Sequence, residues 1–287
     1  MSTLTSSAPA SSANHVPGPS FLRVLNAEAI KTRTLLSTTI LLLCAVALMA
    51  GFAALQAWGT GEFTRAAATD PEAAAALAQQ GGDIALTIPT AAVSFTQLII
   101  GALAVLAMSS EFTTGMARAT FSAVPQRLPV LAAKLLLVVV LAFVVTYSGA
   151  MLGGLAAQPI VQEYDLALDL ASQDVQRSIL LNGVYVAAVA AMGLGLGTLL
   201  RNSAGAIVTL VAGLFVLPII FQLIPGEFFE EARKYLPTNA ASAMVQWGVD
   251  PVAGSQLLEP WQGALILAGY VAALVVGAAA SLKARDV

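Results

Sequence analysis

The stretch from residue 135 to residue 157, LLLVVVLAFVVTYSGAMLGGLAA, contains no charged side chain. A helix of roughly 20 apolar residues crosses the hydrocarbon core of a bilayer, so this stretch predicts a membrane-spanning helix. Across the whole chain 58% of the residues are hydrophobic, 10% are charged, and the mean hydropathy is +0.83. Soluble domains carry about 25% charged residues, so lipid is the expected solvent of this protein.

Gaps between successive charged residues locate the other spans, because an ionised side chain at the centre of a bilayer costs about 3 kcal/mol or more. Six gaps of 23 to 28 uncharged residues are long enough. They predict spans at residues 36–56, 89–109, 135–157, 179–200, 205–224 and 261–282. The predicted fold class is an all-α integral membrane protein with six transmembrane helices.

The distribution of Lys and Arg predicts the orientation. If both termini lie inside, the inner segments hold nine basic and three acidic residues, a net charge of +6. The outer segments then hold four basic and 13 acidic residues, a net charge of −9. Because positive residues are retained on the cytoplasmic side of short loops, we expect a multi-pass protein of the cell membrane with both termini in the cytoplasm.

The chain divides into a tail and one membrane domain. Residues 1–20 are rich in Ser, Ala and Pro and carry no charge, which predicts a disordered cytoplasmic tail. A signal peptide would have basic residues before its apolar segment. Residues 21–287 form the predicted six-span domain.

Two short amphipathic helices are predicted outside the spans. Phe21, Leu22, Leu25 and Ala29 share one helical face just before the first span, a pattern that fits an interfacial helix and an ordinary basic flank equally well. In the last outer loop, apolar residues at helical spacing predict a short extracellular helix that Pro237 ends, with Trp247 and Trp261 as interfacial anchors. These apolar residues are Phe228, Phe229, Ala232, Tyr235 and Leu236.

The loop between the second and third spans, residues 109–136, is too polar to span and too long for a turn. Ser109 or Ser110 can cap a new helix with Glu111 in its first turn, where a carboxylate suits the helix dipole. Gly115 and Pro125 would then break that helix. The predicted result is a short helix on the cytoplasmic face, with Arg118 and Arg127 exposed and with Phe121 and Val124 available for another surface. The alternative is a solvated basic loop with nothing bound.

This loop resembles that of the membrane permeases of ABC-2 type transporters. The matching residues, in the order of the family pattern, are Glu111, Gly115, Arg118, Pro125, Arg127 and Lys134. Glu28 and Lys31 resemble the acidic and basic pair of the family's N-terminal elbow helix. The resemblance implies that the loop contains a coupling helix, which docks on a separate ATP-binding subunit, and that Phe121 belongs to the same interface. It also implies that two permeases, as a homodimer or with a sister permease, enclose an export pathway.

The sequence lacks residue types and motifs that several functions require, and this narrows the choice of function. The sequence contains no Gly-Lys dipeptide and hence no phosphate-binding loop, so ATP hydrolysis is expected in a partner and not in this chain. The predicted spans contain no charged residue or His, which an ion-coupled carrier usually needs. Ser148 has no base in the spans, and His15 lies in the tail, so an enzyme is not expected and neither a cofactor nor a metal is implied.

The alternatives that stay open are a secondary carrier, a channel, and a membrane scaffold or sensor. Nucleic acid is not an expected partner. Uncharged spans favour apolar or amphipathic cargo such as a lipid, a drug-like compound or a peptide.

Small residues and one proline mark the spans. Gly149 with Gly153, and Gly193 with Gly197, have the four-residue spacing that allows close helix approach. We expect them to serve in helix packing or at a seam between two copies. Pro218 predicts a kink in the fifth span, because it removes a backbone hydrogen bond.

Overall fold

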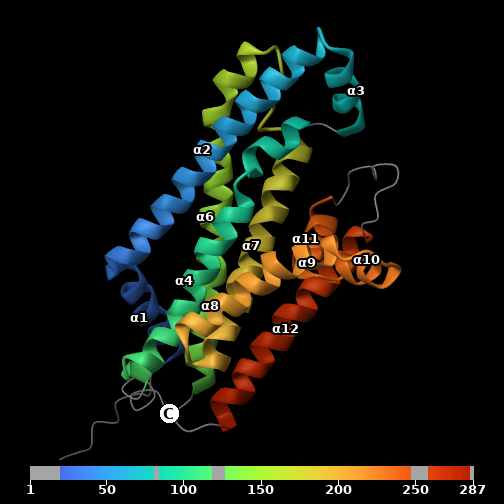
Figure 1. The fold of residues 1–287 in the computed structure, drawn as a ribbon. Coiled ribbons are helices and arrows are strands. Elements are labelled where there is room, and N and C mark those ends of the chain that lie inside the picture. The colour runs from blue at the N-terminus through green and yellow to red at the C-terminus, as the bar shows by residue number, and fades with distance from the viewer. Residues whose placement is uncertain (1–19, 81–83, 118–126, 247–257, 285–287) are drawn as a thin grey trace, which may run out of the picture.

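The computed structural model describes residues 20–80, 84–117, 127–246 and 258–284, and these contain helices and no strands. The elements are α1 (Phe21–Thr34), α2 (Leu36–Ala67), α3 (Pro71–Gln80), the 3-10 helix η1 (Ile84–Thr90), α4 (Val93–Thr113), α6 (Arg127–Glu163), α7 (Gln173–Leu200), α8 (Ser203–Val211), the π-helix η2 (Ala212–Val216), α9 (Leu217–Leu223), α10 (Glu227–Lys234), α11 (Pro237–Val245) and α12 (Pro260–Ala284). Figure 1 shows them as one elongated bundle.

Six of the described helices are long and apolar enough to cross a membrane, which confirms the predicted number of spans. They comprise Leu36–Ala67, Leu86–Thr113, Arg127–Glu163, Gln173–Leu200, Ser203–Leu223 and Pro260–Ala284. Two are much longer than predicted. At 1.5 Å per residue, the 32 residues of α2 extend about 48 Å and the 37 residues of α6 about 55 Å. The hydrocarbon core is only about 30 Å thick, so both helices project beyond it.

α7 is the central helix of the bundle. In its most apolar window 72% of the residues are buried, against 17% in α2, in the span from α8 to α9, and in α12. Close approach depends on glycine here. A Cβ on Gly193 would lie 2.6 Å from the carbonyl oxygen of Gly101, and one on Gly197 would lie 2.6 Å from that of Val105. α4 therefore packs directly on the backbone of α7.

The other predicted glycine pair joins α6 to α2. A Cβ on Gly149 would lie 2.6 Å from the sulfur of Met49, and one on Gly153 would lie 3.1 Å from the carbonyl oxygen of Met49. The glycine faces of both pairs are thus occupied by helices of the same chain. This is the helix-packing role, and it leaves no room for a second copy at those faces.

The fifth span is irregular where Pro218 was expected to disturb it. The five residues of η2, Ala212–Val216, form a π-helix directly before α9, whose first turn holds Pro218. Proline cannot donate to the carbonyl a turn earlier, and the wider π-turn accommodates that loss. Ala206, Leu210 and Leu214 are buried, whereas α9 buries no residue. The helix leaves the bundle after η2.

The segment before the sixth span contains two helices where the sequence predicted one. α10 is short and exposed, with Phe228 73% accessible, and it ends at Lys234. Pro237 begins the next helix, α11, because the first turn of a helix needs no N–H from that position. α11 buries Ala240 and Met244 and packs on α12 at Gly263, whose added Cβ would meet the Ala240 oxygen at 2.3 Å. Trp261 is exposed, and Trp247 lies outside the described residues.

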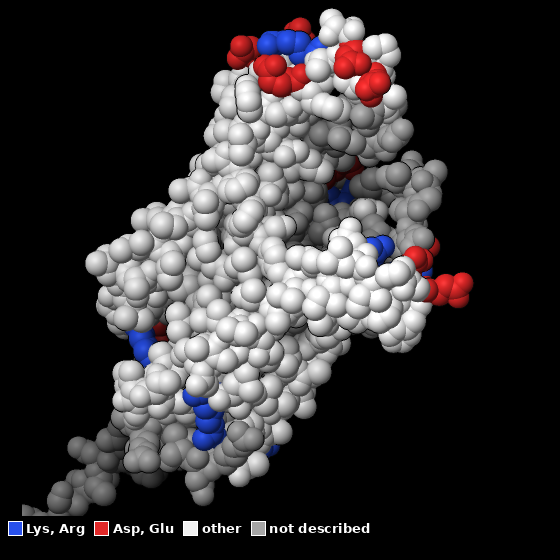
Figure 2. All heavy atoms as spheres, viewed as in Figure 1, with Lys and Arg blue, Asp and Glu red and all other residues white. Residues whose placement is uncertain are grey.

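The two ends of the bundle differ in charge. α1, the end of α4, the start of α6 and the end of α12 gather at one end, and α3 lies at the other (Figure 1). In Figure 2 acidic side chains gather near α3 and α10, the visible charges at the opposite end are mostly Lys and Arg, and the surface between is almost uncharged. The segments that the charge count assigns to the inside thus share one end. The compartment that this end faces stays a prediction.

Candidate functional site

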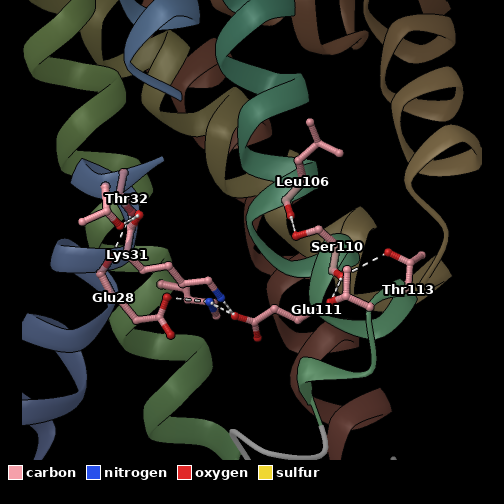
Figure 3. Close-up of polar contacts among 10 residues, drawn as sticks. Glu28, Lys31, Thr32, Leu106, Ser110, Glu111 and Thr113 are labelled. Carbon is pink, nitrogen blue, oxygen red and sulfur yellow. Dashed lines mark hydrogen bonds and ion pairs between the residues drawn. The ribbon is translucent and has the colours of Figure 1, made fainter. Parts of the chain in front are cut away.

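Four charged side chains from three helices meet at the end of the bundle where α1 lies. This ionic cluster comprises Glu28 and Lys31 of α1, Glu111 of α4 and Lys134 of α6. Lys134 Nζ donates to Glu28 Oε2 at 2.5 Å and to Glu111 Oε1 at 2.7 Å, and Lys31 Nζ donates to the same Glu111 oxygen. Figure 3 shows Glu28 and Lys31 directed from α1 toward Glu111. Two positive and two negative groups give the cluster no net charge.

The cluster is largely removed from water. The side chains of Glu111 and Lys134 are 1% and 3% exposed, and only that of Lys31 reaches 33%. Buried ions persist when each has a partner, because an uncompensated charge in a medium of low dielectric is very costly. Glu111 Oε2 is buried and has no hydrogen-bond partner among the described residues. This carboxylate oxygen is thus an open position of the cluster.

The local structure around Glu111 contradicts the predicted cap. α4 runs without a break through Ser109 and Ser110, whose hydroxyls bond back to the carbonyls of Val105 and Leu106. Glu111 therefore lies in the last turn of α4 and not in the first turn of a new helix. A carboxylate is unfavourable beside the negative end of a helix dipole, and the two lysine ammonium groups compensate for this.

The end of α4 follows the sequence prediction more closely. Gly115 has φ +73°, the left-handed conformation that glycine adopts without steric cost, and the helix ends at Thr113. A Cβ at this glycine would meet nothing within 4 Å, so the backbone angle and not the space explains the residue type. Gly115 thus ends the helix, as expected, although it ends α4 itself.

The remaining predicted residues fall into two groups. Arg118, Phe121 and Pro125 lie outside the described residues. Arg127 begins α6 and was expected to be exposed, but it is half-buried and its Nη1 donates to the carbonyl oxygen of Leu282 at 2.8 Å. It therefore attaches the end of α12 to the start of α6. Lys134 was expected to precede the third span, and it lies two turns inside α6 because that helix starts at Arg127.

Two further contacts at this end were not foreseen. The hydroxyls of Ser109 and Ser203 share a hydrogen bond at 2.8 Å, which joins α4 to α8. The guanidinium of Arg201 lies 4.8 Å from the ring centre of Phe112. Arg201 ends α7 in the left-handed conformation, φ 51°, and Asn202 caps α8 by accepting from Gly205 N. The sequence signal for the close packing of α8 at this end was the very short turn between α7 and α8.

The charged side chains of this site form ion pairs with one another. Among the described residues no three His, Cys, Asp or Glu side chains are grouped so that they could hold a metal ion. No protein-family model matches the sequence, and no curated protein sequence matches it.

Proposed function

We propose that this chain is the membrane-spanning permease subunit of an ABC-2 type transporter in the plasma membrane. Two copies enclose the pathway, and a separate ATP-binding subunit docks on the cytoplasmic face, where both termini lie. The cargo is an amphipathic compound, a lipid or a peptide, and it is exported. The chain itself does not hydrolyse ATP, because its sequence lacks a phosphate-binding loop.

The ionic cluster is the observation that carries this proposal. Glu111 and Lys134 flank the loop that would receive the ATP-binding subunit. Lys134 forms ion pairs with both Glu111 and Glu28. A force applied at the loop therefore acts on α1, α4 and α6 together, since separating them would expose unpaired buried charges. The order of Glu111, Gly115 and Lys134 along the chain is also that of the permease family.

A secondary carrier is the second candidate, and one observation favours it. The predicted spans held no charged residue, but the membrane-spanning helices of the structure include both Glu111 and Lys134. Carriers use ionisable groups at such positions for proton or ion coupling. The free oxygen of Glu111 fits that role. Both lysines nevertheless neutralise this carboxylate within the chain, which favours a structural joint. A channel and a scaffold or sensor have no comparable support.

Purification in mild detergent, followed by mass spectrometry, tests the class directly. We expect a soluble protein with a phosphate-binding loop to accompany the chain in stoichiometric amount. Arg118→Glu should weaken this association at least about tenfold, because a lost charged contact at an interface costs about 2 to 5 kcal/mol. Arg127 is unsuitable for this test, because its substitution would also release Leu282.

Lys283→Glu is the matched control, since Lys283 is exposed at the same end of the bundle and the charge change is identical. This variant should retain the partner at equal membrane abundance. Loss of the partner in both variants would point to a diffuse charge effect. A preparation without any nucleotide-binding partner would contradict the proposal and favour the carrier.

A further inference from the structure

A cavity of about 310 Å³ lies beside the ionic cluster, between α1, α2, α4, α6 and α7. Its volume is at the lower limit of the range of about 300 to 1,000 Å³ that is typical of ligand sites. Glu28, Lys31 and Lys134 contribute to one end of it. The established contacts of the cluster do not fill this space, and neither the sequence nor the proposed function assigns it an occupant.

The lining changes from polar to apolar along each of three helices. On α2 it passes from Ser37 and Thr38 to Leu41 and Leu42. On α4 it passes from Ser110 through Ala107 to Leu103 and Ile100, and on α6 from Lys134 through Leu137 to Leu141. Ser110 and Ile100 are ten positions apart, which corresponds to about 15 Å of helix. The cavity is therefore a narrow slot that runs into the bilayer from a charged end.

The charged end can accept an anion. Of the three charged residues in the lining, two are lysines and one is a glutamate. Lys31 is the more exposed lysine, at 33%, and its ammonium has three N–H donors, of which the contact with Glu111 uses one. The hydroxyls of Ser37 and Thr38 border the same end. An acidic head group would find a cation and two hydroxyl donors there.

We infer that the cavity binds one acyl chain of an anionic membrane lipid, with the lipid phosphate beside Lys31. The exposed Leu35 and Leu106 in the lining place its opening on the lipid-facing surface, where a chain can enter sideways. The volume of about 310 Å³ is too small for both chains of a phospholipid and holds part of one. This inference rests on membrane insertion and on the geometry, and it holds whether or not the chain is a transporter subunit.

Native mass spectrometry of the whole protein tests the inference. The purified protein in nonionic detergent is mixed with equal amounts of phosphatidylglycerol and phosphatidylcholine. We expect retention of phosphatidylglycerol in preference to phosphatidylcholine. Lys31→Gln should reduce that preference about fivefold, as expected for one cation near a lipid surface. Arg33→Gln is the matched control, because Arg33 is exposed two residues further along α1 and does not line the cavity.

A second pair of variants tests the cavity itself. Ala107→Phe places a ring in the slot and should abolish lipid retention. Ala132→Phe makes the same change at an exposed position of α6 outside the lining and should leave retention unchanged. Both variants must elute from a size-exclusion column like the parent protein. Retained lipid in a folded Ala107→Phe variant would overturn the inference, as would equal losses in Lys31→Gln and Arg33→Gln.

Photochemical cross-linking on the parent protein needs no variant. Phosphatidylglycerol with a diazirine near the end of one acyl chain should label residues 100–107 of α4 or residues 137–142 of α6. Labelling only on the exposed faces of α2 or α12 would show ordinary solvation by lipid and would refute the site. A second protein copy in the slot would exclude the lipid and would leave the parent without any preference, which also refutes it.

Discussion

Ion pairs at the two ends of this bundle differ in the distance along the chain that they bridge. In the ionic cluster the partners are 80, 106 and 23 residues apart, and they join three helices. Elsewhere the pairs Glu62–Arg65, Asp174–Arg177 and Glu231–Lys234 each join residues three apart on one helix. A local exposed pair stabilises only its own helix and contributes about 0.3 to 0.5 kcal/mol. A buried long-range cluster fixes how helices are arranged relative to one another.

The end near α3 has a long-range contact of a different kind, the Tyr164 lock, which comprises Glu62, Arg65 and Tyr164. The hydroxyl of Tyr164 donates to Glu62 at 2.6 Å, and the Arg65 guanidinium lies 4.5 Å from the centre of its ring. A Cβ on Gly61 would collide with that ring, so α2 carries glycine at the contact. This lock holds the projecting end of α2 against the segment after α6. Glu62 and Arg65 are largely exposed to solvent, whereas Glu111 and Lys134 of the ionic cluster are buried.

The largest expected effect concerns the side of the membrane on which each end lies. In a Cys44→Ser background, Thr69→Cys should react with an impermeant thiol reagent added to intact cells, and Thr114→Cys should react only after the membrane is opened. Both residues are exposed and lie at opposite ends of the bundle. Labelling of Thr114→Cys in intact cells would invert the orientation, and the ATP-binding subunit could not dock as proposed.

The next effect separates the cluster from the local pairs. Lys134→Met should lower the free energy of unfolding by about 3 to 5 kcal/mol, because it leaves two buried carboxylates without their shared cation. Lys234→Met breaks an exposed ion pair between residues three apart on one helix. It should change the free energy of unfolding by less than about 1 kcal/mol. Unfolding by sodium dodecyl sulfate in mixed micelles measures both. Equal losses would remove the distinction between the two ends.

A combined variant shows whether charge or packing accounts for that loss. Replacing Glu28 and Glu111 by Gln in the Lys134→Met background removes the uncompensated charges while keeping similar volumes. We expect much of the lost stability to return, because the cost comes from unpaired buried ions and not from missing contacts. A triple variant less stable than Lys134→Met alone would show that Lys31 needs the carboxylates more than Lys134 does.

The smallest effect is expected at Tyr164. Its hydrogen bond to Glu62 raises the pKa of the Tyr164 phenol above its ordinary value of 10.0. The folded protein thus holds this proton more tightly than the unfolded chain. The contribution to stability is complete below pH 10.0 and disappears as the pH rises through the raised pKa. Parent and Tyr164→Phe should differ in melting temperature below pH 10.0 and converge only above the raised pKa of Tyr164. A phenolate absorbance transition of Tyr164 at or below pH 10.0 would refute this lock.

The sequence predicted the number of spans because their main determinant is local. A run of uncharged residues can be recognised without knowledge of the fold. The fifth uncharged run predicted a span at residues 205–224, which matches Ser203–Leu223 to within two residues at each end. The predicted first and third spans stopped short of the ends of α2 and α6, because each charged residue was taken as the limit of a span. Glu62 and Lys134 both lie inside helices, since a helix continues beyond the hydrocarbon or through it when the charge has a partner.

The sequence predicted which residues belong to the candidate site, but it did not predict how they are arranged. Glu28, Lys31, Glu111 and Lys134 were all selected from the resemblance, yet nothing in the local sequence indicates that they contact one another. Ser110 followed by Glu111 is a common start of a helix, and the tertiary pairing with α1 and α6 instead places Glu111 at a helix end. α11 was missed for the same reason, because its small residues acquire meaning only against Gly263 of α12.

The π-helix in the fifth span gives that span one residue more than regular winding needs. A π-turn closes with a hydrogen bond between residues i and i+5, so it holds one residue more than an α-turn while the chain turns by nearly the same angle. Deletion of one residue within Ala212–Val216 should therefore restore regular winding and leave α9 facing nearly the same way. Deletion of one residue from the regular helix α8 should instead rotate α9 by about 100° and carry Phe221 away from Phe229, whose ring centre lies 5.4 Å from its own. The π-helix is thus a place where the length of the fifth span can change without moving α10.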